Sequence, residues 1–144
     1  MKVLLGVIGS FVAIYGFAIL LETPKKYLPH AGAIGAIGGF VYLISLQFNV
    51  DVVRAAFFSA LAIALTSHTF ARVFKAPVTI FLVAGMLPTV PGAGMYKIVY
   101  YIIAGNQKQS SYYFVQTLEI AGMMALAIFI VDTLFKMRIR KKSK

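Results

Sequence analysis

The sequence predicts an all-α integral membrane protein with five transmembrane helices, the fourth of them broken near its middle. Three observations support this fold class. Of the 144 residues, 60% are hydrophobic and 12% are charged, whereas a soluble domain is about half apolar and about a quarter charged. The mean hydropathy is +0.87. The apolar residues gather in five long segments separated by polar residues, glycine and proline.

Each apolar segment is long enough to cross a bilayer, because about 20 helical residues rising 1.5 Å each span a hydrocarbon layer of ~30 Å. The predicted spans are residues 3–21, 31–48, 52–70, 78–104 and 112–135, followed by a basic cytoplasmic tail at 136–144. We expect a single transmembrane domain over 1–144. The first span is too long for a signal-peptide core, so we expect it to stay in the mature protein.

Turn and capping residues separate the predicted spans. Pro29 is expected in the loop before the second helix, and Asp51 can begin the third. Pro77 can occupy the first turn of the fourth helix, and Gly105 can end it.

The basic residues predict the orientation. The chain has 14 Lys and Arg against 4 Asp and Glu, a net charge of +10. With the C-terminus inside, ten basic residues are cytoplasmic, three are external and Lys97 lies within a span. The ten are Lys25, Lys26, Arg72, Lys75, Lys136, Arg138, Arg140, Lys141, Lys142 and Lys144, and the three are Lys2, Arg54 and Lys108. The positive-inside rule therefore predicts an external N-terminus and a cytoplasmic C-terminus, in the plasma membrane (the cell inner membrane).

Small residues recur at helical spacing in the second span, at Ala31, Gly35 and Gly39. Such positions let helix backbones approach closely in lipid. We expect them to pack within the chain, and a dimer face is the alternative.

Two prolines lie near the middle of the fourth span. Pro88 and Pro91 each remove an amide donor and clash with a carbonyl, at about 3 kcal/mol or more per proline. Gly92 and Gly94 weaken the helix further, and Thr89 adds a hydroxyl. A helix broken at mid-span can direct free amides and free carbonyls toward a ligand. The alternative is a kink that only shapes the bundle.

Two charged residues, Lys97 and Glu119, lie inside predicted spans, where each costs about 2.5 to 3.5 kcal/mol at a helix centre. They can form a structural ion pair joined by Gln116, or one of them can bind substrate or a proton. Tyr96 is close enough to the break to line a cavity. His68, at the inner end of the third span, can relay protons or simply lie at the membrane interface.

Enzyme chemistry finds little support in the sequence. It has no HExxH, glycine-rich phosphate loop or GxSxG motif. It also has no cysteine. We expect no catalytic residue, no metal and no cofactor.

Residues 72–96 resemble the signature of the threonine/serine exporter family, in its small, separately encoded membrane subunit. The shared elements are Arg72 before a lysine-x-proline, Phe81 four residues beyond that proline, the P-x-x-P-G break and Tyr96. The resemblance implies export of small amino acids or small carboxylates. It also implies a larger partner subunit with a cytoplasmic N-terminal part and a second membrane half.

We therefore expect the membrane subunit of a secondary exporter of threonine and serine or of small carboxylates. Its partners would be the lipid bilayer, the substrate, and the larger subunit or further copies of itself, with no nucleic acid. The alternative is a non-transporting scaffold or assembly subunit whose proline break is a packing kink. The candidate substrate-binding residues are Pro88, Thr89, Pro91, Gly92, Gly94, Tyr96, Lys97 and Glu119, and the candidate proton-coupling residues are Glu119 and His68.

Overall fold

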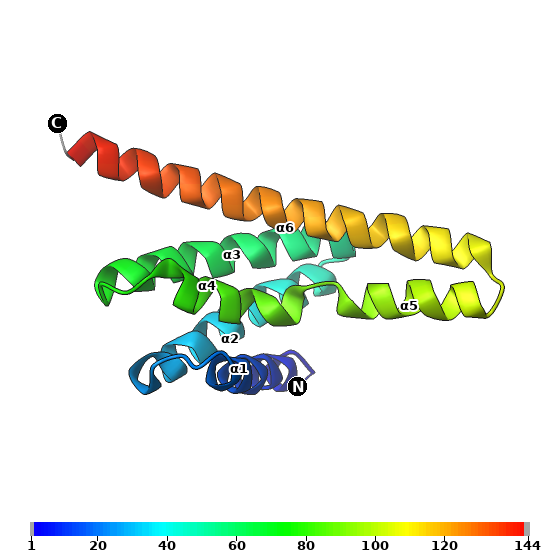
Figure 1. Cartoon of the computed structure of the whole chain (residues 1–144), viewed down its shortest axis with the longest axis horizontal. Coiled ribbons are helices and arrows are strands. Elements are labelled where there is room, and N and C mark those ends of the chain that lie inside the picture. Colours follow the sequence, from blue (N-terminus) through cyan, green and yellow to red (C-terminus); the bar gives the residue numbers. More distant parts are fainter. Residues whose placement is uncertain (1, 143–144) are drawn as a thin grey trace.

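The computed structural model of the chain describes residues 2–142, and this part is entirely helical between its turns (Figure 1). The helices are α1 (Lys2–Leu20), α2 (Leu28–Gln47), α3 (Val52–Val73), α4 (Val78–Met86), α5 (Gly92–Ile103) and α6 (Gln107–Lys142). Two short 3-10 helices, η1 (Lys25–Tyr27) and η2 (Leu87–Thr89), precede α2 and follow α4. The predicted all-helical class is confirmed.

Local residue chemistry explains most helix boundaries. The Asp51 carboxylate caps α3 by accepting a hydrogen bond from the Val53 amide at 3.2 Å. Gly105, with φ at 71°, turns the chain after α5, a conformation that glycine adopts without strain. Pro77 is the N-cap of α4 rather than part of its first turn.

Two helices start more than one residue earlier than predicted, and α3 and α6 also extend to Val73 and Lys142, beyond the predicted ends at 70 and 135. Pro29 lies in the first turn of α2 instead of in the preceding loop, because a first-turn residue needs no amide partner and suits the fixed φ of proline. Helix α6 begins at Gln107, five residues before the predicted span at 112. There the Asn106 side chain accepts a hydrogen bond from the Gln109 amide at 3.2 Å, so a polar first turn is stabilised ahead of the apolar residues.

Four helical segments of the described chain are long and apolar enough to cross a membrane: Val3–Leu20, Lys25–Gln47, Val52–Val73 and Gln107–Met137. The predicted fourth span is divided into α4, of nine residues, and α5, of twelve. Each is shorter than the ~20 residues that a spanning helix needs.

Helix α2 lies at the centre of the bundle, in contact with α1, α3 and α4, while α3 also packs along α6. Glycines of α2 let its backbone lie close to α1 and α3. Any Cβ atom at Gly35 would collide with Ile14 of α1, and Ser59 of α3 donates a hydrogen bond to the Gly38 carbonyl at 2.9 Å. These small residues of α2 therefore pack within the chain, as predicted. The bundle has an Asp51 end, where α3 begins, and an Arg72 end, where α3 finishes.

Candidate functional site

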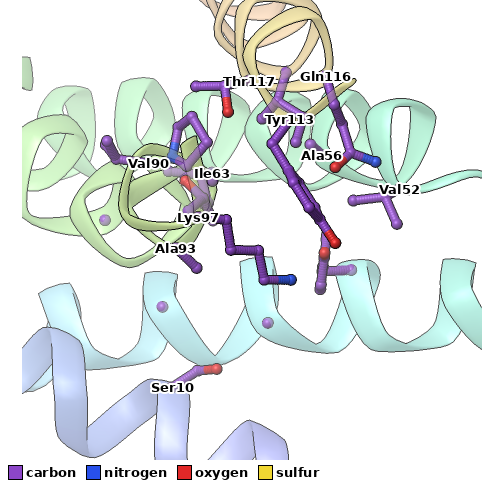
Figure 2. Close-up of a pocket in the computed structure, with 18 of the residues that line it drawn as sticks. Ser10, Val52, Ala56, Ile63, Val90, Ala93, Lys97, Tyr113, Gln116 and Thr117 are labelled. Atoms are coloured by element: carbon purple, nitrogen blue, oxygen red, sulfur yellow. The ribbon is translucent and has the colours of Figure 1, made fainter. Parts of the chain in front are cut away.

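A cavity of about 580 Å³ lies beside the interruption between α4 and α5. Residues of all six α-helices and of η2 line it, so it sits inside the helical bundle (Figure 2). Polar side chains on its walls include those of Thr89, Lys97, Tyr113, Gln116 and Thr117. The cavity extends toward the Asp51 end, where Val52 of α3 is one of its walls.

The interruption is partly capped by its own residues. The Thr89 hydroxyl donates a hydrogen bond to the Met86 carbonyl at 2.7 Å. The Val90 amide donates to the same carbonyl at 3.2 Å, and the Gly92 amide donates to the Val90 carbonyl at 2.7 Å. The Thr89 proton and the Gly92 amide are therefore already engaged.

Free amide donors begin at Ala93, one residue after Gly92. Within residues 2–142, the amides of Ala93 and Gly94 have no backbone partner, and both residues line the cavity. The Thr117 hydroxyl of α6 is buried without a hydrogen-bond partner in the described chain, and it lies against Gly94. Two amides at the positive end of a helix and one unpaired hydroxyl thus converge on one wall.

Lys97 is the one charged side chain among the described residues that line the cavity. Its ammonium lies 4.7 Å from the centre of the Tyr113 ring, a cation–π contact between α5 and α6. Figure 2 shows the side chain reaching into the space between these helices and α2. A lysine with no carboxylate beside it favours an anionic group in this cavity.

Glu119 lies outside the cavity. Its exposed side chain lines a shallow groove with Asp51 and Lys108. The Lys97–Glu119 ion pair is absent from the described contacts. Since Thr117 is on the cavity side of α6, a residue two positions later points about 200° away around the helix. Gln116, expected beside Glu119, borders both the groove and the cavity.

The structure gathers four of the predicted substrate-binding residues at the cavity: Thr89, Pro91, Gly94 and Lys97. Gly92 is exposed with open space around it. Tyr96 is 70% exposed and stacks on Tyr100 with ring centres 6.2 Å apart. The side chain of Pro88 lies outside the described part of the structure.

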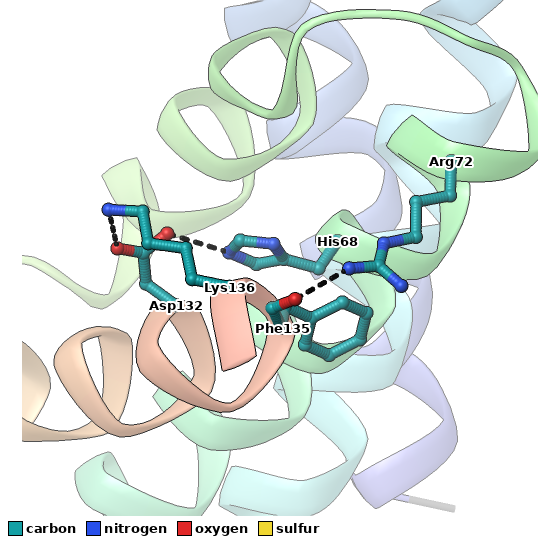
Figure 3. Close-up of polar contacts among 5 residues, drawn as sticks. All are labelled: His68, Arg72, Asp132, Phe135 and Lys136. Carbon is teal, nitrogen blue, oxygen red and sulfur yellow. Dashed lines mark hydrogen bonds and ion pairs between the residues drawn. The ribbon is translucent and has the colours of Figure 1, made fainter. Parts of the chain in front are cut away.

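His68 lies between α3 and α6 near the Arg72 end, away from the cavity (Figure 3). Its Nε2 atom is 3.9 Å from the Asp132 carboxylate, which also binds the Lys136 ammonium at 2.6 Å. The imidazole packs on the Phe135 ring at 4.8 Å. Arg72 donates a hydrogen bond to the Phe135 carbonyl at 2.9 Å. His68 is therefore buried between two helices and not exposed at their surface.

An aromatic cluster fills the bundle between the cavity and the Arg72 end. Phe81, at its centre, is fully buried. Its ring centre lies 5.4 Å from that of Tyr27, 6.2 Å from Phe70 and 6.3 Å from Phe74. Phe81 lies one helical turn before Gly85, a wall of the cavity. This aromatic cluster therefore lies between the cavity and the Arg72 end.

The sequence predicted Glu119 and Gln116 of α6 at the site, but not the face of this helix that lines the cavity. Tyr113, Gln116, Thr117 and Ile120 all line the cavity. Their spacing of i, i+3, i+4 and i+7 places them on one helical face. That spacing was a usable signal, but nothing in the sequence indicated that this face meets α5.

Several helices of spanning length around a cavity that contains a few polar side chains and one lysine define a multi-pass membrane protein with the features of a transporter. The chain belongs to the threonine/serine exporter family, because a match to the family described as Threonine/Serine exporter, ThrE, covers residues 6–134. This confirms the resemblance seen in residues 72–96, and the members of the family are transporters.

A curated protein of Haemophilus influenzae, described as an uncharacterized protein, is 27% identical to the chain over 97 residues. The match covers 67% of this chain and 33% of that protein, so this chain spans only about a third of the relative's length. No solved structure matches the chain.

Proposed function

We propose that this chain is the membrane subunit of a secondary exporter of small amino acids, threonine or serine, or of small carboxylates. The substrate binds in the cavity between the start of α5 and the facing side of α6. We propose transport and no enzymatic reaction.

The observation that carries the proposal is the donor set on one wall of the cavity. The Lys97 ammonium, the amides of Ala93 and Gly94, and the buried Thr117 hydroxyl all lack a hydrogen-bonding or charged partner within the described chain. A carboxylate can accept hydrogen bonds from all of these groups, and the positive end of α5 adds to the attraction. A buried hydroxyl without a partner costs free energy, so a ligand that satisfies it is favoured.

The remaining polar groups suit the rest of a small substrate. The Gln116 amide oxygen and the Thr89 oxygen can accept hydrogen bonds from a hydroxyl or an ammonium. Pro91 and Gly94 keep the wall free of large side chains. In this proposal Pro88 helps to interrupt the helix, while Gly92 and Tyr96 support the site from outside the cavity.

We propose that α4, η2 and the first half of α5 together form the fourth of five spans within a single transmembrane domain. The N-terminus is then external and the C-terminus cytoplasmic, in agreement with the ten cytoplasmic and three external basic residues. The cavity extends toward the external side, and the aromatic cluster around Phe81 closes it on the cytoplasmic side. Export then requires this cluster to open to the cytoplasm.

Coupling and partner are further parts of the proposal. His68, in contact with the Asp132 carboxylate, is the better candidate for a coupling proton. Glu119, exposed beside the groove at Asp51, is the second candidate. The family resemblance suggests a larger subunit with a second membrane half, and the H. influenzae relative has chain length to hold one.

Efflux from loaded proteoliposomes tests the proposal. The chain, alone and with a larger family subunit, would be reconstituted in vesicles loaded with labelled threonine, serine or a small dicarboxylate. We expect Lys97→Met to lower the flux of the transported compound roughly tenfold or more, as loss of one charged hydrogen bond of about 1.5 to 3 kcal/mol predicts. Lys108→Met is the matched control, because it removes the same charge outside the cavity.

Two results would reject the proposal. The first is Lys97→Met transporting as well as the wild-type chain. The second is an absence of flux and of binding for all three compounds in an assembled complex, which would favour the scaffold alternative.

A further inference from the structure

Helix α5 exposes an apolar stripe on the side that faces away from α6. The stripe consists of Tyr96, Val99, Tyr100 and Ile103, which are 70%, 56%, 53% and 82% exposed. Their spacing of i, i+3, i+4 and i+7 places them on one face of the helix. None of the residues of α5 is buried, and α6 is the one helix against which α5 packs extensively. The stripe is thus unpartnered within the described chain.

The hairpin formed by α5 and α6 extends beyond the other helices. Arg72 donates a hydrogen bond to the Phe135 carbonyl, and His68 lies beside Asp132. The two residues of each pair differ by 63 and 64 in number. Each residue of α6 therefore lies level with the α3 residue whose number is 63 or 64 smaller. Position 116 is therefore level with Val52, the first residue of α3. Residues 107–115 project past α3 by roughly 13 Å at 1.5 Å per residue. Figure 1 shows the same arrangement.

The hydrocarbon layer of the bilayer does not reach the far end of this exposed stripe, an inference that rests on the membrane spans proposed above. Helix α3 has 22 residues and is about 33 Å long, which already matches the ~30 Å hydrocarbon layer. The Ser110 hydroxyl bonds to the Ile98 carbonyl at 3.2 Å, so the second half of α5 lies beside the projecting part of α6. Val99, Tyr100 and Ile103 therefore reach beyond the hydrocarbon, where exposed apolar side chains favour a protein contact.

We propose that the stripe binds the same stripe of a second copy of this chain, so that two α5 helices pair about a two-fold axis. A charged patch could select an unlike partner, but the stripe has no charge, because Lys97 points into the cavity. In a two-fold contact each residue meets its own counterpart, and tyrosine and branched aliphatic side chains pack well against each other. Tyr96 and Tyr100 are already stacked into one continuous surface.

With the whole stripe covered, the buried area reaches the threshold for a specific contact. At roughly 150 to 250 Å² for a large side chain, the exposed fractions of the four residues amount to on the order of 500 Å² per copy. Two copies then bury about 1,000 Å², the lower bound for a specific interface. Side chains of α6 near the hairpin tip, such as the half-exposed Phe114, can add to this area.

Disulfide trapping tests the pairing, because the chain has no cysteine of its own. Val99→Cys and Ile103→Cys would be introduced singly, reconstituted in lipid vesicles and oxidised with copper phenanthroline. The control is Ile102→Cys, which is 62% exposed on the same helix but points about 100° away from Ile103. We expect at least roughly tenfold more covalent dimer from the two stripe variants, since helical spacing separates them from the control.

A second measurement is needed because a dimer can form without bringing the two introduced cysteines into disulfide geometry. Tyr100→Lys places a charge at the centre of the stripe, and we expect it to convert the wild-type dimer into a monomer, counted by single-molecule photobleaching. Equal trapping at Ile102, a wild-type monomer in vesicles, or a stripe covered by a different subunit would overturn the proposal. The test needs no substrate. A dimer that forms while the assembled, uncrosslinked complex neither transports nor binds the three compounds would therefore reject the proposed transport function and leave this inference standing.

Discussion

Gly94 of α5 lies so close to the Thr117 hydroxyl of α6 that a Cβ atom at position 94 would overlap it. This contact joins the two helices at the wall of the cavity where the free amides of α5 begin. The glycine therefore serves both the packing of α5 on α6 and the approach of a ligand to the backbone.

Gly94→Ala should lower the thermal unfolding midpoint of the chain in detergent. Forcing an extra methyl group into a packed contact typically costs about 1 to 3 kcal/mol, and the same methyl group would obstruct the ligand. Gly92→Ala is the matched control, because open space surrounds position 92. Replacement of an exposed helical glycine by alanine should be neutral or stabilising by up to about 1 kcal/mol.

The double variant Gly94→Ala/Thr117→Ala separates the two effects. Removal of the hydroxyl should restore much of the lost stability, while substrate binding stays weak because a donor is missing. If Gly94→Ala proved as stable as Gly92→Ala, the close approach of α5 and α6 would be incorrect.

The Lys97–Tyr113 contact predicts a difference between two substitutions of the tyrosine. Tyr113→Phe keeps the ring that holds the ammonium and should bind substrate within about twofold of the wild-type affinity. Tyr113→Leu removes a cation–π contact of roughly 0.5 to 1 kcal/mol and should weaken binding a few-fold. Binding of labelled substrate to the purified chain measures both. Equal losses in the two variants would assign the effect to the tyrosine hydroxyl and not to its ring.

The helices could be predicted from the sequence because each rests on local information. Long apolar segments fixed α1, α2 and α3 to within three residues at each end, whereas the polar ends of α6 lie outside its predicted span. Asp51 and Gly105 fixed the ends of two helices. The interruption near Pro88 and Pro91 was equally local, since proline removes a donor wherever it stands. Pro29 was misplaced because a proline is compatible with both a loop and a first helical turn.

The site depended on contacts between helices, which the sequence does not state. Lys97 and Glu119 were placed at similar depth from their positions along α5 and α6, but depth does not determine the face of a helix. The facing residue proved to be Tyr113, and Glu119 lies on another side of α6. Likewise, the free amides belong to Ala93 and Gly94 because the chain turns back locally to engage Gly92.

We expect the rate of transport to depend on pH if His68 carries the coupling proton. Histidine ordinarily titrates between pH 5 and 8, so wild-type flux should change across that range. His68→Gln can still hydrogen-bond to Asp132 but holds no proton. Its flux should therefore be flat with pH and equal to the wild-type flux at the alkaline end. Vesicle efflux measured at several pH values gives the comparison.

His30→Gln is the control, because it removes the other of the two histidines and His30 packs on Phe74 away from the cavity-lining residues. It should retain the wild-type pH profile. A pH profile that is unchanged in His68→Gln would exclude His68 as the coupling residue and would favour Glu119, the second candidate.

Replacement of Phe81 is expected to lower the stability of the chain and to open the cavity toward the Arg72 end. It is fully buried at the centre of the aromatic cluster, where Phe→Ala substitutions cost about 3 to 5 kcal/mol. Phe81→Ala should therefore unfold at a clearly lower temperature. Since the cluster separates the cavity from the Arg72 end, the same variant should let loaded substrate leave vesicles without regulation. Phe129→Ala, at a position 68% exposed, should change neither property.

Phe81→Leu keeps most of the apolar volume and guards against a variant that fails to fold. We expect it to fold and to release substrate faster than the wild-type chain, because a leucine cannot reproduce the edge-to-face contacts with Tyr27 and Phe70. Folded Phe81 variants that retain substrate as well as the wild-type chain would show that the aromatic cluster is not the barrier on this side of the cavity.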